Sequence, residues 1–298
     1  MEARGMYRND SSSGEEFSSD NPGERMWAGA EQGERRLDGS IRPTVSVVIP
    51  TLNEAANLPH VLLRLPDIVD EVILVDGRSI DSTVEVARAL LPDVRIVLQQ
   101  GRGKGNALAC GVAVASGDII VMLDADGSTD PAEIPRFVDA LMNGSDFAKG
   151  TRFRDGGGSA DITRVRRLGN HALTSLVNKL FGTSYSDLCY GYNALWSRCV
   201  EHLNVTCDGF EVETLMNIRA AVAGLVVTEV PSVEHERIHG ESNLNAVRDG
   251  TRVLRTILRE WLRRGDVGQA NGWHPQYLEL PLPAETDHRS AAPVVVSP

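Results

Sequence analysis

From about residue 43 onward, short apolar runs alternate with stretches that carry helix signals. The apolar runs predict strands at residues 45–49, 71–75, 94–98 and 118–123, and the stretches between them predict helices at 53–65, 82–91 and 105–115. Strands that are apolar on both faces need cover on both faces, as in a parallel sheet. The pattern therefore predicts an α/β doubly wound sheet, in which ligands bind at the carboxyl ends of the strands.

The two ends of the chain lack this pattern. Residues 1–42 are rich in Ser, Gly, Glu and Asp, and residues 266–298 are rich in proline, so we expect a disordered N-terminal tail and a loosely ordered C-terminal tail. The folded domain is then predicted at 43–265. No apolar run approaches the roughly 18–20 residues of a membrane-spanning helix, and the first forty residues lack the apolar segment of a secretory signal.

Charge and cysteine usage exclude two classes of function. The net charge of −11 argues against a nucleic-acid partner, because phosphate backbones attract basic surfaces. The four cysteines include no Cys-x-x-Cys pair, which indicates reduced thiols in a cytoplasmic protein and no zinc site.

Two carboxylates follow the fourth predicted strand directly. Asp124 and Asp126 are one residue apart at a strand end, so both can point into the same crevice. Hard oxygen ligands at this spacing suit Mg²⁺ or Mn²⁺, which in turn binds phosphates. The competing interpretation is a solvated turn, since Gly127, Ser128 and Pro131 follow.

Two further candidates stand at neighbouring strand ends. Asp76 ends the second strand, where a carboxylate can accept hydrogen bonds from a base or a ribose. Lys104 lies in a glycine-rich segment, 101–106 (GRGKGN), whose glycines allow a backbone to approach an anion near a helix N-terminus. Lys104 is followed by Gly105 rather than Ser or Thr, which excludes a Walker A loop. The alternative is an exposed glycine turn.

Taken in order, these segments resemble glycosyltransferase family 2 with its GT-A fold, and in particular the dolichol-phosphate mannosyltransferase-like branch. The segments that carry the likeness are 46–54 (SVVIPTLNE), Asp76 with Ser79 and Asp81, 103–105 (GKG), 124–126 (DAD), 150–153 (GTRF), 156–158 (GGG), 186–193 (SDLCYGYN), 209–213 (GFEVE) and 237–242 (RIHGES). The resemblance spans about residues 45–260. It implies a nucleotide-sugar half at 43–130 and an acceptor half at 131–265.

The resemblance implies a donor site for a UDP- or GDP-sugar. Pro50, Asn53 and Glu54 would line the nucleotide pocket, and Asp76 would contact the base or ribose. Asp124 and Asp126 would then flank the metal that bridges the diphosphate, with Asp124 also counted among the donor-binding residues and Lys104 close to the donor crevice.

The resemblance also implies the catalytic groups. Arg152 and Arg237 would neutralise phosphate charge, with Arg237 on a loop that closes over the donor. Asp187 is the candidate general base for the acceptor, and Glu211 and Glu213 are candidate acceptor contacts. One base without an evident second nucleophile favours inversion at the anomeric carbon, with metal and arginines stabilising the leaving nucleoside diphosphate.

The chain departs from the family pattern at several positions. The family's V-D-D-G-S reads VDGRS at 75–79, so the choice between uracil and guanine stays open. Ser128 stands where a further metal-binding side chain is often found, and Asn243 replaces a frequent lysine. His239, in the loop after Arg237, is a candidate to approach the metal or the diphosphate.

The acceptor side carries two amphipathic helix patterns, at 164–181 and at 246–264. The second alternates apolar positions with arginines. These patterns allow three interpretations, namely packing with a solvated arginine face, a basic surface on anionic lipid, or a homodimer contact. The lipid interpretation would place the protein at the inner face of the membrane and fit a polyprenyl-phosphate acceptor. An acceptor hydroxyl of a glycan or small molecule remains the alternative.

Other classes of function compete with a metal-dependent, inverting glycosyltransferase. The run that ends in DADGS at 124–128 also resembles the motif of haloacid dehalogenase-like phosphatases, in which Asp124 would be the nucleophile. However, that motif normally opens its domain, whereas three strand–helix units precede it here. A non-catalytic nucleotide-sugar-binding module is the third interpretation.

Overall fold

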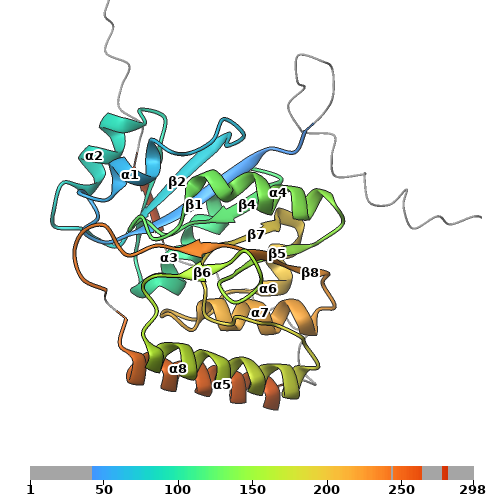
Figure 1. Ribbon diagram of the computed structural model, residues 1–298. Helices are drawn as coiled ribbons and strands as arrows, with labels where there is room; N and C mark the ends of the chain where they lie inside the picture. The colour runs from blue at the N-terminus through green and yellow to red at the C-terminus, as the bar shows by residue number, and fades with distance from the viewer. Residues whose placement is uncertain (1–41, 243, 264–276, 281–298) are drawn as a thin grey trace, which may run out of the picture.

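The computed structural model describes residues 42–242, 244–263 and 277–280 (Figure 1). The expected N-terminal tail, apart from Arg42, and most of the expected C-terminal tail lie outside these residues. The strands of the main sheet are β1 (Val45–Thr51), β2 (Glu71–Asp76), β3 (Arg95–Gln99), β4 (Ile119–Met122), β5 (Phe147–Thr151), β7 (Asn193–Trp196), β8 (Val227–Pro231) and β10 (Tyr277–Leu280), while β6 (Gly158–Ser159) and β9 (Val233–Glu234) pair separately. The helices are α1 (Leu58–Leu62), α2 (Thr83–Leu90), α3 (Gly103–Val114), α4 (Ile134–Met142), α5 (Arg164–Phe181), α6 (Val200–Leu203), α7 (Val212–Val222) and α8 (Ala246–Leu262).

The eight-stranded sheet has the order β10-β3-β2-β1-β4-β7-β5-β8. Parallel pairing joins β3, β2, β1 and β4, and also β5 with β8, whereas β10 and β7 run antiparallel to their neighbours. This architecture confirms the predicted doubly wound, mostly parallel sheet. Strand β10 lies within the stretch expected to be loosely ordered, and it pairs with β3 from Tyr277 opposite Gln99 to Leu280 opposite Ile96.

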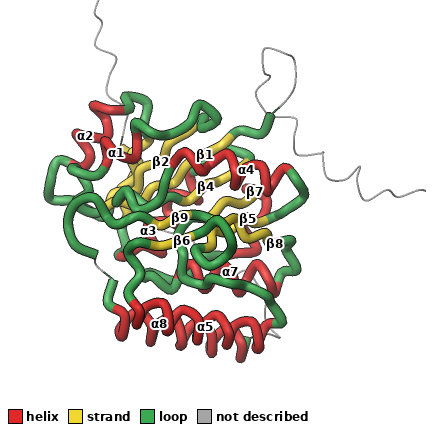
Figure 2. The backbone as a smooth tube through the Cα atoms, viewed as in Figure 1, coloured by secondary structure: helices red, strands yellow, loops and turns green. Residues whose placement is uncertain are grey.

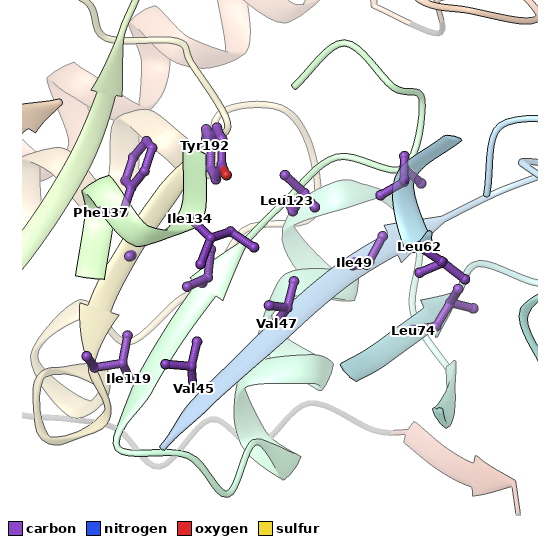
Figure 3. Close-up of a cluster of buried hydrophobic side chains, with 14 of the residues drawn as sticks. Val45, Val47, Ile49, Leu62, Leu74, Ile119, Leu123, Ile134, Phe137 and Tyr192 are labelled. Atoms are coloured by element: carbon purple, nitrogen blue, oxygen red, sulfur yellow. The ribbon is translucent and has the colours of Figure 1, made fainter. Parts of the chain in front are cut away.

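Both faces of the sheet are covered by helices (Figure 2). On one face, Val45, Val47 and Ile49 of β1 belong to a buried cluster with Ile134 and Phe137 of α4, as Figure 3 shows. On the other face, buried side chains of α3, α6 and α7 pack against the sheet. Helices α5 and α8 form a third cluster with α7, so they lie beyond it as an outer layer.

The first helix is much shorter than predicted. Asn53 has a φ of 58°, which does not fit a right-handed helix, and its backbone N–H donates to Ser79 Oγ at 2.8 Å. The Asn53 side-chain oxygen accepts from the Ile80 N–H, and the Glu54 N–H donates to Thr83 Oγ1. Bonds to the loop after β2 therefore hold this segment as a turn, and the helix begins only at Leu58.

The two amphipathic helices of the second half form at the predicted positions. Thr163 caps α5 by accepting from the Arg166 N–H, and the helix ends at Gly182 with a φ of 68°. Asn245 caps α8 in the same way through the Arg248 N–H. Within the described ranges, no helix is long and apolar enough to cross a membrane.

Candidate active site

A cavity of about 280 Å³ lies beyond the end of β4, between that edge of the sheet and the N-terminal turns of α5 and α8. Six carboxylates line it: Asp124, Asp126, Asp161, Glu213, Glu234 and Asp249. Four cationic side chains line it as well: Lys104, Arg152, Arg166 and Arg237. The formal excess of negative charge favours a cation in this cavity and disfavours an anionic diphosphate that arrives without one.

Asp124 is held by a lysine from the first turn of α3. The Lys104 Nζ lies 2.7 Å from Asp124 Oδ1 and 2.9 Å from Glu213 Oε1. Burial alone would lower the pKa of Lys104, but the charges of Asp124 and Glu213 outweigh it and raise that pKa above its usual value. Gly191 makes room for this cluster, because a Cβ there would lie 2.5 Å from the Lys104 Nζ.

Asp126 is held by an arginine from the segment after β9. Arg237 Nη1 lies 3.3 Å from Asp126 Oδ2, and its Nη2 pairs with Glu54. This segment also bonds through its backbone, since the Ile238 N–H donates to the Asp126 carbonyl at 3.2 Å and the His235 N–H donates to the Ser128 carbonyl at 2.7 Å. Arg237 therefore joins Asp126 to Glu54.

His239 does not join the two aspartates. Its ring lies beside that of His60, with 5.7 Å between the ring centroids, and its backbone N–H and carbonyl both bond to the Asn57 side chain. Within residues 42–242, 244–263 and 277–280, no three His, Cys, Asp or Glu side chains gather to hold a metal. These contacts give no support to His239 as a metal ligand, and that role stays a prediction.

Asp124 and Asp126 nevertheless fit Mg²⁺ or Mn²⁺. Both line the cavity, and both already bind a cationic side chain there. Mg²⁺ commonly takes one or two carboxylates and completes its shell with water and substrate phosphates, so two ligands from the protein suffice. Ser128 donates its backbone N–H to Asp126 Oδ1 at 3.0 Å and so orients that carboxylate.

Arg152 and Asp187 form a buried pair beside the cavity. Arg152 Nε and Nη2 donate to the two oxygens of Asp187 at 2.7 and 2.9 Å, while Nη1 donates to Glu234 at 3.1 Å. Burial alone would raise the pKa of Asp187, but hydrogen bonds and charge from Arg152, together with Lys149, lower it. Asp187 has no exposed surface and does not line the cavity. Burial and a lowered pKa favour a role for Asp187 in positioning Arg152, and its role as general base stays a prediction.

Asp76 stands at the far end of the same sheet edge. Its Oδ2 accepts the backbone N–H groups of Arg78 and Ser79 at 2.9 and 3.0 Å. Asp76 is only 3% exposed, and its buried Oδ1 has no hydrogen-bond partner. Pro50 lies on the adjacent strand, opposite Val75. An unpaired buried acceptor is costly, so it fits an absent donor such as a base N–H or a ribose hydroxyl.

The glycine-rich segment serves packing. A Cβ at Gly103 would lie 2.1 Å from the Asp208 carbonyl oxygen, and one at Gly105 would lie 2.3 Å from the Cys207 carbonyl oxygen. The Gly105 N–H donates to the Asp208 carbonyl at 3.0 Å. These glycines therefore admit the backbone of 207–209, and the approach of this segment to an anion stays a prediction. Only Lys104 of this segment lines the cavity.

The two glutamates predicted to contact the acceptor differ in their position relative to the cavity. Glu213 lines the cavity, whereas Glu211 does not. Sequence reasoning missed Glu234 and Asn170, which bind Arg152 and Asp187 respectively. The sequence does carry a signal for Asn170, because a polar residue there interrupts the apolar face of α5. Glu234 had none, since it stands in a short strand after an irregular segment.

Comparison with known proteins decides the family. The model of glycosyl transferase family 2 matches residues 46–202, which is more than half of the chain and contains Asp76, Asp124, Arg152 and Asp187. This chain belongs to glycosyltransferase family 2. It is therefore a glycosyltransferase, and the alternative of a haloacid dehalogenase-like phosphatase loses its support.

Individual relatives agree with this assignment. Glycosyltransferase AglJ of Haloferax volcanii is 32% identical over 221 residues, which cover 72% of this chain and 71% of AglJ. Polyprenol monophosphomannose synthase of Mycolicibacterium smegmatis is 30% identical over 268 residues, covering 84% and 98%. Glucosyl-3-phosphoglycerate synthase of Mycobacterium tuberculosis, crystallised with Mn²⁺, UDP and glucosyl-3-phosphoglycerate, superposes with a TM-score of 0.60 at 25% identity, covering 80% and 86%. The predicted GT-A fold and the likeness to the dolichol-phosphate mannosyltransferase-like branch are thus confirmed.

Proposed function

We propose that this protein transfers a sugar from a UDP- or GDP-sugar to the phosphate of a polyprenyl phosphate, with Mg²⁺ or Mn²⁺ as cofactor. The observation that carries the proposal is the meeting of Asp124, Asp126, Lys104 and Arg237 in one cavity at the carboxyl edge of the sheet. The names of the relatives support both ends of the reaction, since one is a polyprenol monophosphomannose synthase and another was crystallised with Mn²⁺ and UDP.

The donor end of the cavity is assigned as follows. Asp124 and Asp126 would hold the metal ion, and a metal ion there would supply positive charge to the diphosphate leaving group. Lys104 and Arg237, which pair with these carboxylates, would turn to the diphosphate oxygens when the donor binds. Asp76 accepts a hydrogen bond from the base or ribose through its unpaired Oδ1.

The acceptor end needs no general base when the nucleophile is a phosphate. A phosphate monoester loses its second proton with a pKa of about 6, so one of its oxygens is already an anion at neutral pH. That oxygen attacks the anomeric carbon from the face opposite the diphosphate, the bond from carbon to diphosphate oxygen breaks, and the electron pair leaves with the diphosphate. Buried Asp187 then positions Arg152, whose charge faces the phosphates.

The outer face of α8 is assigned to the surface of an anionic membrane. Leu254, Leu258, Trp261 and Leu262 are exposed there, and Arg252, Arg255, Arg259 and Arg263 are exposed beside them. A helix with exposed apolar and arginine side chains binds anionic lipid through apolar burial and charge together. A lipid acceptor would then be reached from the membrane surface.

The test is a donor panel with matched variants. Purified protein is given each of several UDP- and GDP-sugars with Mn²⁺ and a polyprenyl phosphate, and release of the nucleoside diphosphate and formation of glycolipid are measured. Asp124→Asn and Asp126→Asn should lower turnover by about 10²–10³-fold, because each removes charge that holds the metal at the leaving group. Asp93→Asn changes an exposed aspartate and serves as the control.

Three outcomes would contradict the proposal. Donor binding without turnover of any acceptor would favour the non-catalytic nucleotide-sugar-binding module. Hydrolysis of a simple phosphomonoester that is lost in Asp124→Asn would support the haloacid dehalogenase-like phosphatase. Transfer to a hydroxyl acceptor but to no phosphate would keep the transferase and reject the acceptor proposed here.

A further inference from the structure

We propose that Asn57 is a positioning residue for the donor, whose side-chain amide holds the segment 235–239 so that Arg237 can face the diphosphate. This inference rests on the proposed function, in which Arg237 binds the diphosphate, and adds a residue that acts through it. Asn57 itself does not line the cavity, so its effect on a ligand there must pass through another residue.

The Asn57 amide binds both backbone groups of one distant residue. Its Oδ1 accepts the His239 N–H at 2.9 Å, and its Nδ2 donates to the His239 carbonyl at 3.1 Å. The same Nδ2 donates to Glu54 Oε2 at 2.6 Å. Asn57 is only 2% exposed, and water does not readily replace a bond that is lost at a buried amide.

The start of α1 does not account for these bonds. Asn57 comes directly before this helix, where an asparagine side chain commonly caps a helix by accepting one of its first N–H groups. The Asn57 side chain makes no such bond with α1. Its partner His239 lies 182 positions further along the chain. The amide therefore fixes the position of a distant segment rather than the end of its own helix.

The same backbone unit also holds the Arg237 side chain. Arg237 Nε donates to the His239 carbonyl at 2.6 Å, which is the oxygen that Asn57 also binds. Arg237 Nη2 pairs with Glu54, and Nη1 lies 3.3 Å from Asp126 Oδ2. Asn57, Glu54, Arg237 and His239 thus form a closed circuit of hydrogen bonds, and the guanidinium in this circuit is the one that also reaches Asp126.

The segment that carries Arg237 lies at the surface, where Ile238 is 43% exposed. Its backbone is attached to the loop after β4 through the His235 and Ile238 N–H groups, and to the start of α1 through Asn57. Removal of the Asn57 amide frees the part of the backbone that follows Arg237. Donor binding must then order this part, which lowers the affinity.

The test measures the binding of UDP and of GDP in the presence of Mn²⁺ by isothermal titration calorimetry, and continues with the nucleotide that the wild type binds more tightly. Asn57→Ala should weaken binding by about tenfold, because two buried hydrogen bonds to the segment are lost. Arg237→Ala should weaken it at least as much. In the Arg237→Ala protein, Asn57→Ala should have no further effect, because the side chain that Asn57 positions is gone.

Hydrogen exchange supplies a second measurement that needs no ligand. The amides of 235–240 should exchange faster in Asn57→Ala than in the wild type, since the His239 N–H loses its acceptor. Asn57→Ser is a second variant, whose shorter side chain cannot span both backbone groups of His239, and it should behave like the alanine variant in both measurements. Urea unfolding checks that each variant is folded.

Asn178→Ala is the matched control. The Asn178 amide binds both backbone groups of Tyr185 in the same way, at 2.8 and 2.9 Å, and it does not line the cavity. Its effect on nucleotide affinity should be the same in the wild-type protein and in Arg237→Ala, and exchange over 235–240 should stay unchanged.

The outcomes separate this inference from the proposed function. If the wild type binds neither nucleotide with Mn²⁺, the proposed function itself is contradicted. Unchanged or raised affinity in Asn57→Ala, while Arg237→Ala weakens binding, would overturn the role of Asn57 alone. A loss that persists undiminished in the Arg237→Ala protein would also overturn it, because Asn57 would then act through Glu54 or through the fold. Wild-type affinity in Arg237→Ala would overturn both this inference and the assignment of Arg237 to the diphosphate.

Discussion

Replacing Asp187 by asparagine distinguishes a structural carboxylate from a catalytic base. The carboxylate accepts five hydrogen bonds, of which three come from Arg152, one from Asn170 and one from the Cys189 N–H. In Asp187→Asn an amide NH₂ faces donors, and Arg152 keeps only Glu234 as a charged partner. Breaking a buried ion pair by removing one partner costs about 3–5 kcal/mol, so the free energy of unfolding should fall by this amount.

The assay is urea unfolding at pH 7 followed by thermal unfolding. For a domain of this size, each kcal/mol shifts the Tm by about 2–4 °C, so a loss of roughly 10 °C is expected. Asp155→Asn, which changes an exposed aspartate three residues from Arg152, is the control and should stay close to wild type.

The pH dependence of this stability has a definite sign. The pKa of Asp187 is lowered in the folded protein, so the folded state binds the Asp187 proton more weakly than the unfolded chain does. The contribution of this group is present in full above the unfolded carboxyl pKa of about 3.9, and it disappears as the pH falls through the lower folded pKa. The difference in stability between wild type and Asp187→Asn should therefore shrink in acid.

One result would refute this reasoning. If Asp187→Asn unfolds within about 0.5 kcal/mol of wild type while transfer is abolished, the carboxylate contributes little to the fold and acts on the acceptor. If the variant loses stability and keeps kcat for a phosphate acceptor with a raised KM, Asp187 is a positioning residue for Arg152.

Three further predictions follow from the same contacts. Lys104→Met should tighten Mn²⁺ binding in the absence of nucleotide, since Asp124 loses its competing cation; unchanged or weaker affinity by electron paramagnetic resonance would contradict this. Gly103→Ala should cost about 1–3 kcal/mol more than Gly144→Ala, because both have a positive φ but only the first Cβ meets a carbonyl oxygen; equal losses in urea unfolding would reject the contact. Trp261→Ser should reduce flotation with anionic vesicles at low salt, whereas wild-type protein that never floats would exclude the membrane surface.

The strands of the first half could be predicted because burial on both faces leaves continuous apolar runs. Val45–Thr51 and Ile119–Met122 form where the pattern put them. The turn at Asn53 was not predictable in this way, because bonds from Ser79 and Thr83 override the local helix signal. Such contacts join residues more than twenty positions apart, and a local pattern carries no information about them.

In the candidate site, too, a local pattern predicts some residues, whereas others are brought in only by the fold. Asp124 and Asp126 could be found because a strand end fixes where they point, and Asp76 for the same reason. The partners of these residues come from elsewhere in the chain, and only the fold brings Arg237 to Asp126 over 111 positions. Asp187 was identified from its motif as important, but its role depends on burial, which a motif does not state.

The ion pairs in the cavity also bear on how metal and donor bind. Lys104 and Arg237 pair with the carboxylates of Asp124 and Asp126, so a metal ion that binds these carboxylates must compete with two internal cations. A diphosphate alone meets a cavity with an excess of carboxylates. In the proposed function, a diphosphate bound with the metal would give Lys104 and Arg237 new partners and so reduce both costs. Metal and donor should therefore strengthen each other's binding, and because such coupling is reciprocal, the factor by which the donor raises the affinity for Mn²⁺ must equal the factor by which Mn²⁺ raises the affinity for the donor.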